Sequence, residues 1–282
     1  MSNQPIDVRR TAKLFIGGQF PRSESARSFE VVDRNGTFLA NASLASRKDA
    51  RDAVVAARAA FAGWSGATAY NRGQVLYRVA EIMQGRREQF VDELAAWIER
   101  DAAEREVDAA IDRWVWFAGW ADKLAMVTGS NNPVAGPFFN FSIPEPTGVV
   151  AGFAPTENAL LDLVEQVASA IVSGNTVVVV ASLQNPLPAV SLGEVLATSD
   201  VPGGVVNILT GDATEIATWL ASHMDVNAID LTGISDANLA LDLEVSAAEN
   251  LKRVLRADAS VQGLARIKTW LETKTVWHPR GL

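Results

Sequence analysis

Side chains that could act as nucleophiles or metal ligands are scarce in this chain. It contains no cysteine and two histidines, His223 and His278. The lack of a thiol excludes disulfides, thiolate metal sites and cysteine nucleophiles. The two histidines lie too far apart in the sequence to indicate a shared metal site. We therefore predict no metal site.

The common self-contained catalytic motifs are also absent. The sequence has no glycine-rich dinucleotide or phosphate loop, no G-x-S-x-G elbow and no H-E-x-x-H pair. The densest group of carboxylates, which includes Glu106, spans positions 101 to 108 and interleaves with Arg100 and Arg105. Such spacing is typical of a solvated helix face. A paired general acid and base cannot be selected from these residues.

The composition is that of an ordinary globular protein. Of the 282 residues, 48% are hydrophobic and 21% are charged, which favours one large domain or two ordinary ones. The 33 acidic residues outnumber the 25 basic ones and give a formal charge of −8, so we expect no nucleic-acid partner. There is no apolar leader and no run of about 18 apolar residues, so we expect no membrane contact and a cytoplasmic location.

The first half of the chain combines short extended runs with helices. Lys13–Phe20 and Ser28–Val32 predict a small hairpin. Behind a Ser46 cap, apolar residues recur at helical spacing from Arg47. Helical periods continue over three further segments, namely Arg72–Gln84, Arg87–Trp97 and Val107–Leu124. The last of these carries an aromatic stripe that indicates core or a subunit interface.

The second half alternates strands and helices. Residues 128–146 contain Pro and Gly around an alternating run, Phe138–Ile143, which predicts a projecting hairpin or connecting strand. Predicted strands follow at Gly148–Phe153, Thr176–Val180, Val205–Leu209 and Ala228–Leu231, and predicted helices at Leu160–Ser173, Ala189–Thr198, Thr214–His223 and Asp242–Arg256, the last leading into a strand. A strand of four valines must be covered on both faces, so the pattern predicts an open α/β fold with a parallel sheet.

Several segments together resemble the aldehyde dehydrogenase superfamily. They are collinear with the cofactor-binding part of that family: FIGGQF (15–20), DARDAVVAARAAFAGW (49–64), EPTGVVAGFAP (145–155), SGNTVVVV (173–180), NPLPA (185–189), VPGGVVNILTG (201–211) and HMDVNAIDLTG (223–233). The resemblance implies a Rossmann-like, NAD-binding type of parallel sheet with flanking helices and a β-hairpin extension for oligomerisation.

The resemblance changes after residue 251. KRVLRADAS (252–260) occupies the place of the family's ELGGK segment, and the residues from Val261 resemble the family's C-terminal stretch. We therefore expect the catalytic domain, which carries the cysteine, to be absent. The expected divisions are 1–127 (N-terminal hairpin and helices), 128–146 (oligomerisation segment), 147–260 (Rossmann-like core) and 261–282 (oligomerisation tail).

Two family sites are altered in the first half of the core. Where the family has Pro-Trp-Asn, whose Asn stabilises an oxyanion, this chain has Pro155-Thr156-Glu157-Asn158. Glu157 takes the Asn position unless the turn is shifted by one residue. The family's Lys and Glu, which bind the adenosine ribose, are replaced by Val180 and Leu183, so the ribose hydroxyls would lose their partners at about 1–3 kcal/mol each.

The phosphate site and the general base are altered as well. Ile234 replaces the family serine, and Asn238 replaces the glycine that opens the next helix toward the pyrophosphate. The family's general-base glutamate falls at about Ala257. With no cysteine to form the thiohemiacetal, we predict no catalytic residue and weak or lost NAD or NADP binding, hence no cofactor.

Three functions remain open. The first is a non-catalytic subunit, or pseudoenzyme, in a homo-oligomer or in a hetero-oligomer with a full-length aldehyde dehydrogenase; its expected interface residues are Phe138, Phe139, Phe141, Thr275, Val276 and Trp277. The second is a sensor for a small, less polar ligand in the old cofactor cleft, lined by Glu157, Asn158, Thr232 and Ser235. The third is one half of a split NAD(P)-dependent dehydrogenase whose partner supplies the cysteine.

Overall fold

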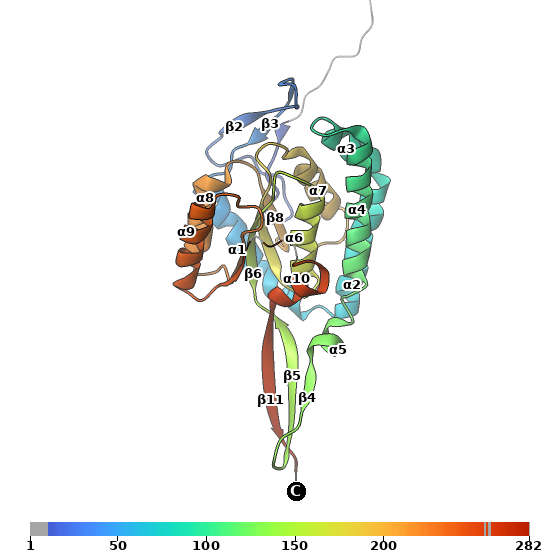
Figure 1. Cartoon of the computed structure of the whole chain (residues 1–282), viewed down its shortest axis with the longest axis vertical. Coiled ribbons are helices and arrows are strands. Elements are labelled where there is room, and N and C mark those ends of the chain that lie inside the picture. Colours follow the sequence, from blue (N-terminus) through green and yellow to red (C-terminus); the bar gives the residue numbers. More distant parts are fainter. Residues whose placement is uncertain (1–10, 257, 259–260, 282) are drawn as a thin grey trace, which may run out of the picture.

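The fold is built on a parallel sheet sandwiched between helices. The structure is a computed structural model and describes residues 11–256, 258 and 261–281. Five strands form the central sheet in the order β10-β9-β6-β7-β8, all parallel (Figure 1). Their bounds are Val149–Phe153 (β6), Thr176–Val180 (β7), Val206–Leu209 (β8), Ala228–Asp230 (β9) and Arg253–Leu255 (β10). The predicted α/β class is confirmed.

Each face of this sheet has its own helical layer because successive side chains of a strand point to opposite faces. Val177 and Val179 pack into a core with helices α2, α3, α4, α6 and α7. Val178 and Val180 pack into a second core with α1, α8 and α9. The helices are Arg47–Gly66 (α1), Ala69–Gly85 (α2), Arg87–Ala95 (α3), Arg100–Ala118 (α4), Leu124–Thr128 (α5), Leu161–Ile171 (α6), Leu187–Ala197 (α7), Ala213–Ser222 (α8), Ala237–Ala248 (α9) and Gly263–Thr269 (α10).

The start of α1 follows from a reciprocal cap. The Ser46 side chain accepts hydrogen bonds from the backbone of Lys48 and Asp49, and the Asp49 side chain accepts from the backbone N–H of Ser46. Two otherwise unsatisfied N–H groups therefore gain partners. Among the described residues, no helix is both long and apolar enough to cross a bilayer.

The predicted N-terminal hairpin is wrong in its pairing. Ser28–Val32 (β2) pairs antiparallel with Phe38–Ser43 (β3), which was not predicted, and Thr11–Ala12 (β1) pairs parallel with β3. Residues 13–20 instead make a tight turn in which Ile16 bridges Gln19. Backbone N–H and C=O groups of Phe15 bond to Ile208 of β8. The apolar segment is therefore buried against the sheet edge, and it does not pair with β2.

The helix predicted over Asp242–Arg256 is misplaced. Helix α9 begins earlier because Asp236 caps the backbone N–H groups of Asn238 and Leu239. It ends before Leu251, which has a positive φ of 58°. The chain then turns into β10, so the strand lies inside the predicted helix. The polar cap and the turn outweighed the apolar spacing that suggested a continuous helix.

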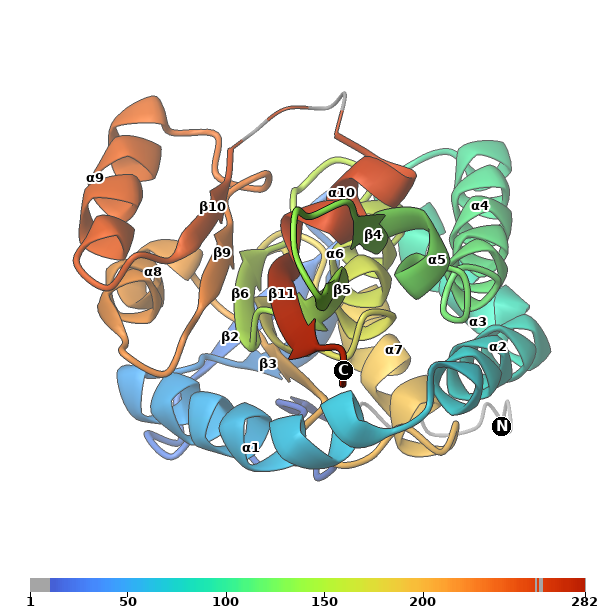
Figure 2. The same ribbon diagram turned by 90° about the horizontal axis from the view of Figure 1, so that it is seen from below.

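A three-stranded antiparallel sheet projects from one end of the molecule (Figures 1 and 2). We call this sheet the stalk; its strands are Ser130–Asn132 (β4), Phe138–Pro146 (β5) and Leu271–Pro279 (β11), in the order β11-β5-β4. All nine residues of β11 pair with β5. The stalk is anchored at its base, where the buried Trp270 donates its indole N–H to Ser169 of α6 at 3.2 Å.

Replacing this anchor should destabilise the whole chain. Trp270→Ala removes a fully buried indole, and we expect a loss of about 3–5 kcal/mol in the free energy of unfolding. Trp277→Ala is the matched control because that ring is 59% exposed on the stalk; it should cost less than about 1 kcal/mol. Urea denaturation followed by circular dichroism measures both, and equal losses would contradict the anchoring role.

Candidate functional site

The strand order places a crevice at one point of the central sheet. From β6 the chain proceeds outward to β7 and β8, then crosses back to β9 and β10 on the other side of β6. The connections after β6 and β9 therefore leave the carboxyl edge in opposite directions. In open α/β sheets, ligands bind outside the carboxyl ends of strands at such a reversal point.

A cavity of about 470 Å³ lies at this position. Its walls are formed by the turn after β6, the first turns of α6, Thr232 just after β9, the segment before α10 and α10 itself. The lining residues are Pro155, Glu157, Asn158, Asp162, Glu165, Thr232, Asp258, Val261, Gln262 and Arg266. Four carboxylates and one guanidinium are among them, so the cavity is predominantly acidic.

A buried ion pair forms one side of this cavity. Arg266 of α10 pairs with Asp230, the last residue of β9, and their side chains are 6% and 1% exposed. Thr232 donates its hydroxyl to Asp230 Oδ1 at 2.6 Å. The same hydroxyl oxygen accepts from the Arg266 guanidinium at 3.3 Å and from Gln166 Nε2 at 3.0 Å. The charge of Arg266 is thus already balanced within the protein.

The other carboxylates differ in how well they are compensated. Glu165 pairs with Arg113 at 2.6 Å and accepts from the backbone N–H of Gly263 at 3.0 Å, which fixes the start of α10. Glu157 and Asp162 have no ion-pair partner within the described part of the chain. The cavity therefore carries uncompensated negative charge.

Glu106 has a different role from the one its sequence context predicted. It is buried and accepts hydrogen bonds from the backbone N–H groups of Leu160 and Leu161, at 2.9 and 3.2 Å. It therefore caps α6 from the neighbouring helix α4, and its assignment to a solvated face is wrong. A carboxylate near a helix N-terminus is stabilised by the unpaired N–H groups there.

Asp162 is the group most affected by this environment. Burial raises its pKa to about 6, Arg266 opposes the rise, and the nearby carboxylates of Glu106 and Glu165 add to it. A carboxyl group that titrates near pH 6 in a cleft is a candidate functional group. It gains a proton readily and would be stabilised in its charged form by a cation.

Three of the four residues predicted to line the cleft do surround the cavity. Glu157 and Asn158 lie on the turn after β6, where Asn158 has a positive φ of 49°, and Thr232 follows β9. Ser235 is exposed in the loop before α9 and is not among the lining residues.

The four altered cofactor positions lie away from the cavity. Val180 is buried at the end of β7, and Leu183 is exposed in the loop that follows. Ile234 packs into the core beneath α8 and α9, and Asn238 is exposed in the first turn of α9. Ala257, the predicted position of the lost general base, lies outside the described residues.

Sequence analysis did not identify Asp162, Glu165, Asp230 or Arg266. Asp162 and Glu165 are three residues apart on α6, a spacing that puts both on one helix face. Asp230 was detectable as an acidic residue at the end of an apolar strand, since a buried carboxylate requires a partner. The partner itself, Arg266, is supplied by a distant segment, and no local pattern indicates it.

The residues at this site do not suit a dinucleotide. The carboxylates of Glu157 and Asp162 would repel phosphates, and the guanidinium among the described lining residues, that of Arg266, is held by Asp230. The turn after β9 also packs closely against the end of β6. A side chain at Gly233 would not fit, because its Cβ would lie 2.0 Å from the carbonyl oxygen of Phe153. The arrangement can bind a cation or exchange a proton at Asp162, but it offers no phosphate cradle.

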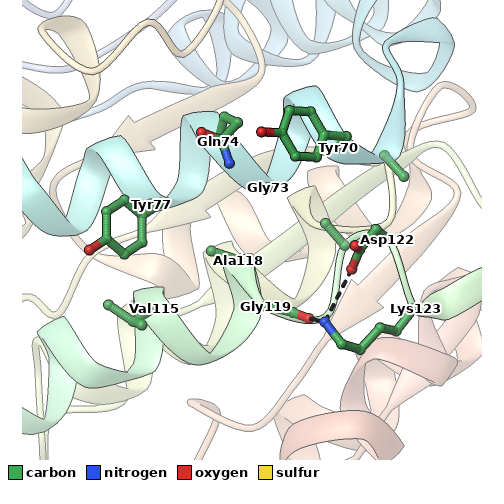
Figure 3. Close-up of a pocket in the computed structure, with 11 residues that line it drawn as sticks. Tyr70, Gly73, Gln74, Tyr77, Val115, Ala118, Gly119, Asp122 and Lys123 are labelled. Atoms are coloured by element: carbon green, nitrogen blue, oxygen red, sulfur yellow. Dashed lines mark hydrogen bonds and ion pairs between the residues drawn. The ribbon is translucent and has the colours of Figure 1, made fainter.

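A second hollow, of about 330 Å³, lies between α2 and α4 (Figure 3). Tyr70 and Tyr77 line it from α2, and Val115 lines it from α4. An ion pair between Asp122 and Lys123, at 3.2 Å, lies at one end. Apart from this pair, the polar side chains that line the groove are uncharged, namely Tyr70, Gln74 and Tyr77, so we do not treat it as a candidate for chemistry. Among the described residues, no group of three potential metal ligands comes together.

The fold and the position of the acidic cavity define a doubly wound α/β protein of the dinucleotide-binding type. The sequence profile of the "Aldehyde dehydrogenase family" matches residues 20–257. The chain belongs to the aldehyde dehydrogenase family, which confirms the resemblance seen in the sequence.

Individual relatives extend beyond the region they share with this chain. Human cytosolic 10-formyltetrahydrofolate dehydrogenase is 33% identical over 261 residues, covering 88% of this chain and 28% of the relative. Arabidopsis thaliana aldehyde dehydrogenase family 2 member B4, mitochondrial, is 32% identical over 259 residues, covering 89% and 47%. A variant of a Bacillus cereus aldehyde dehydrogenase superposes with a TM-score of 0.80 at 25% identity, covering 87% and 50%. The chain thus spans half, or less, of the length of these proteins.

Removing the charge of Asp162 should stabilise the protein at neutral pH. Because the folded state keeps the proton up to about pH 6 and the unfolded chain loses it near pH 4, wild-type stability falls as pH rises between these values. Asp162→Asn should therefore be more stable by about 1–2 kcal/mol at pH 7.5, a figure reduced for solvent screening. Unfolding curves from pH 4 to 8 measure this, with Asp101→Asn, an exposed residue, as control. A less stable Asp162→Asn protein at pH 7.5 would overturn the assignment.

Proposed function

We propose that this chain is a non-catalytic aldehyde dehydrogenase-like subunit that assembles with copies of itself or with a full-length aldehyde dehydrogenase. The observation that carries the proposal is the combination of an intact fold with a sequence that contains no cysteine. The family's aldehyde chemistry begins with a thiol nucleophile, which these residues do not supply.

The turn after β6 supports the same conclusion. Glu157 stands where the family has its oxyanion-binding Asn, and a carboxylate there would repel a developing negative charge. Asn158 lies on the same turn but next to the acidic cavity. With Glu157 in that position of the ungapped alignment, we infer that the site does not stabilise a tetrahedral oxyanion.

We propose the stalk as the interaction surface. Phe139, Phe141 and Ile143 lie on one face of β5, and Val276 of β11 lies opposite Phe141 on the same face. Phe139 is 52% exposed. Exposed apolar side chains gathered on one sheet face mark an association site. We assign this face as the main contact surface of the assembly.

The opposite face of the stalk combines uncharged polar side chains with two aromatic rings, whereas Lys274 and His278 of β11 lie on the face of Ile143 and Phe139. Asn132 Nδ2 donates to Asn140 Oδ1 at 2.6 Å and to Ser142 Oγ at 3.0 Å, and Ser142 bonds Thr275 at 2.9 Å. Phe138 and Trp277 contact each other on this side, with ring centroids 5.8 Å apart. The six predicted interface residues therefore divide between two faces, with Phe139, Phe141 and Val276 on the apolar one.

The edges of the stalk add a second means of association. Within the described residues, β11 and β4 are the outer strands, so each leaves one row of backbone N–H and C=O groups without a strand partner. Proteins generally cover or pair such edges. A strand from another subunit would satisfy them through main-chain hydrogen bonds.

Disrupting the apolar stalk face should weaken assembly without unfolding the chain. The double variant Phe139→Ser/Phe141→Ser removes exposed rings, and we expect at least tenfold weaker self-association or weaker co-purification with a dehydrogenase. Met126→Ser is the matched control, because Met126 is exposed on α5 outside the stalk. Sedimentation velocity and pull-down from the source cells measure the effect. A strictly monomeric wild-type chain that captures no dehydrogenase would refute the proposal.

The acidic cavity favours a second candidate, a ligand-binding role. The aliphatic residues Val180, Leu183 and Ile234 do not line the cavity, so it does not offer the less polar surface that the sequence suggested. Glu157 and Asp162 instead favour a small organic cation, such as a diamine. This candidate does not conflict with assembly through the stalk, which lies at the opposite, amino-terminal side of the sheet.

A thermal-shift panel separates the candidates. We expect 1,4-diaminobutane to raise Tm in wild type and to lose its effect in Asp162→Asn, because the ammonium group loses its counter-ion. NAD and NADP should give no shift. No shift with any compound supports a purely structural subunit, whereas sub-millimolar NAD binding, checked by calorimetry, would favour the split-dehydrogenase alternative and contradict our proposal.

A further inference from the structure

One lysine differs from the rest in its surroundings. The chain has six lysines, and five of them are exposed: Lys13, Lys48, Lys123, Lys268 and Lys274. Lys252 is 8% exposed. It immediately precedes β10, so it lies at the amino-terminal edge of the central sheet, at the other end of the strands from the acidic cavity.

The ammonium group of Lys252 has a neutral partner. Its Nζ donates a hydrogen bond to Asn250 Oδ1, and within the described residues it forms no ion pair with a carboxylate. Asn250 is itself held in place, since its Nδ2 donates to the carbonyl oxygen of Met224 at 3.3 Å. A buried ammonium without a counter-ion is destabilised relative to the neutral amine.

The charged and titratable groups around Lys252 belong to α1, the ends of α8 and α9, and the loop after α8. His223 lies at the end of α8, where burial and the positive charges of Lys252 and Arg58 lower its pKa. Arg58 belongs to α1 and donates to Asn227 Oδ1, in the loop after α8, at 2.6 Å. Asp225 lies beside His223. Glu249, at the end of α9, is the carboxylate that acts on Lys252. Burial outweighs Glu249 and lowers the pKa of Lys252 to about 8.

The surface beside Lys252 is open. Met224 and Leu251, which belong to the two turns that flank it, are 73% and 90% exposed. The positively charged Arg58 lies on the same side, where it donates to the backbone carbonyl oxygen of Asp225 and forms a loose ion pair, at 3.8 Å, with the Asp225 carboxylate. The α8–β9 and α9–β10 turns belong to elements that lie side by side in Figure 2, and a small electrophile would reach Lys252 between these turns.

We propose that Lys252 is an amine nucleophile and a site of covalent acylation by small acyl phosphates. The neutral Nζ attacks the carbonyl carbon, and the C–O bond to phosphate breaks. The phosphate leaves with the bonding electron pair, and the nitrogen loses a proton to solvent to give an amide. Arg58 favours this class of donor because its guanidinium, the fixed positive charge on this side, attracts the phosphate group.

The test is competitive acetylation of the intact chain with limiting acetyl phosphate at pH 7.5, read by peptide mass spectrometry. About a quarter of Lys252 is neutral at this pH, against roughly 0.1% for an exposed lysine. We expect the initial rate at Lys252 to exceed the mean of the five exposed lysines at least tenfold. The rate at Lys252 should level off above about pH 8, whereas the rates of the exposed lysines continue to rise.

Two variants make the result decisive. Asn250→Asp gives the ammonium a carboxylate partner of the same shape, so acetylation of Lys252 should slow at least tenfold while the other sites keep their rates. Lys123→Arg is the matched control and should leave Lys252 unaffected. Lys252 reacting no faster than the exposed lysines, or an Asn250→Asp protein that labels as fast as wild type while folded by circular dichroism, would overturn the proposal.

Discussion

The buried pair of Asp230 and Arg266 joins the central sheet to the segment that leads into the stalk. It joins the end of β9 to α10, and Thr232 and Gln166 extend the contact to α6. Because both charges are withdrawn from water, neither is tolerated without the other. Helix α10 leads directly into β11, so this pair also fixes where the stalk leaves the body.

The same pair changes what the crevice can bind. In a doubly wound sheet the reversal point normally receives a ligand from outside, often through a helix N-terminus that holds phosphate. In this chain the crevice is lined by Arg266, a residue of α10, whose positive charge is paired with Asp230. The remaining wall is acidic, which leaves Asp162 with a raised pKa and favours cations over phosphates. The parallel sheet resembles that of solved aldehyde dehydrogenases, and in this chain the cavity at its reversal point is acidic.

Sequence reasoning was reliable where burial dictates residue type. The valine run of β7 predicted a strand covered on both faces, and its residues do alternate between two cores. Prediction from the sequence failed where a tertiary contact outweighed a local pattern. The segment around Phe15 alternates like a strand but docks on β8. Glu106 sits among exposed charges in the sequence but is drawn inward by unpaired N–H groups at the start of α6.

The sequence by itself determined the α/β class with a parallel sheet, membership of the aldehyde dehydrogenase family and the absence of a thiol, because these depend on residue identity and local period. Only the tertiary structure decided that Arg266 meets Asp230, that Asp162 faces an acidic cavity and that Lys252 is buried without a counter-ion. Those properties depend on distances between segments far apart in the chain. The energy of a charge is set by its solvent exposure and its neighbours, neither of which a local pattern specifies.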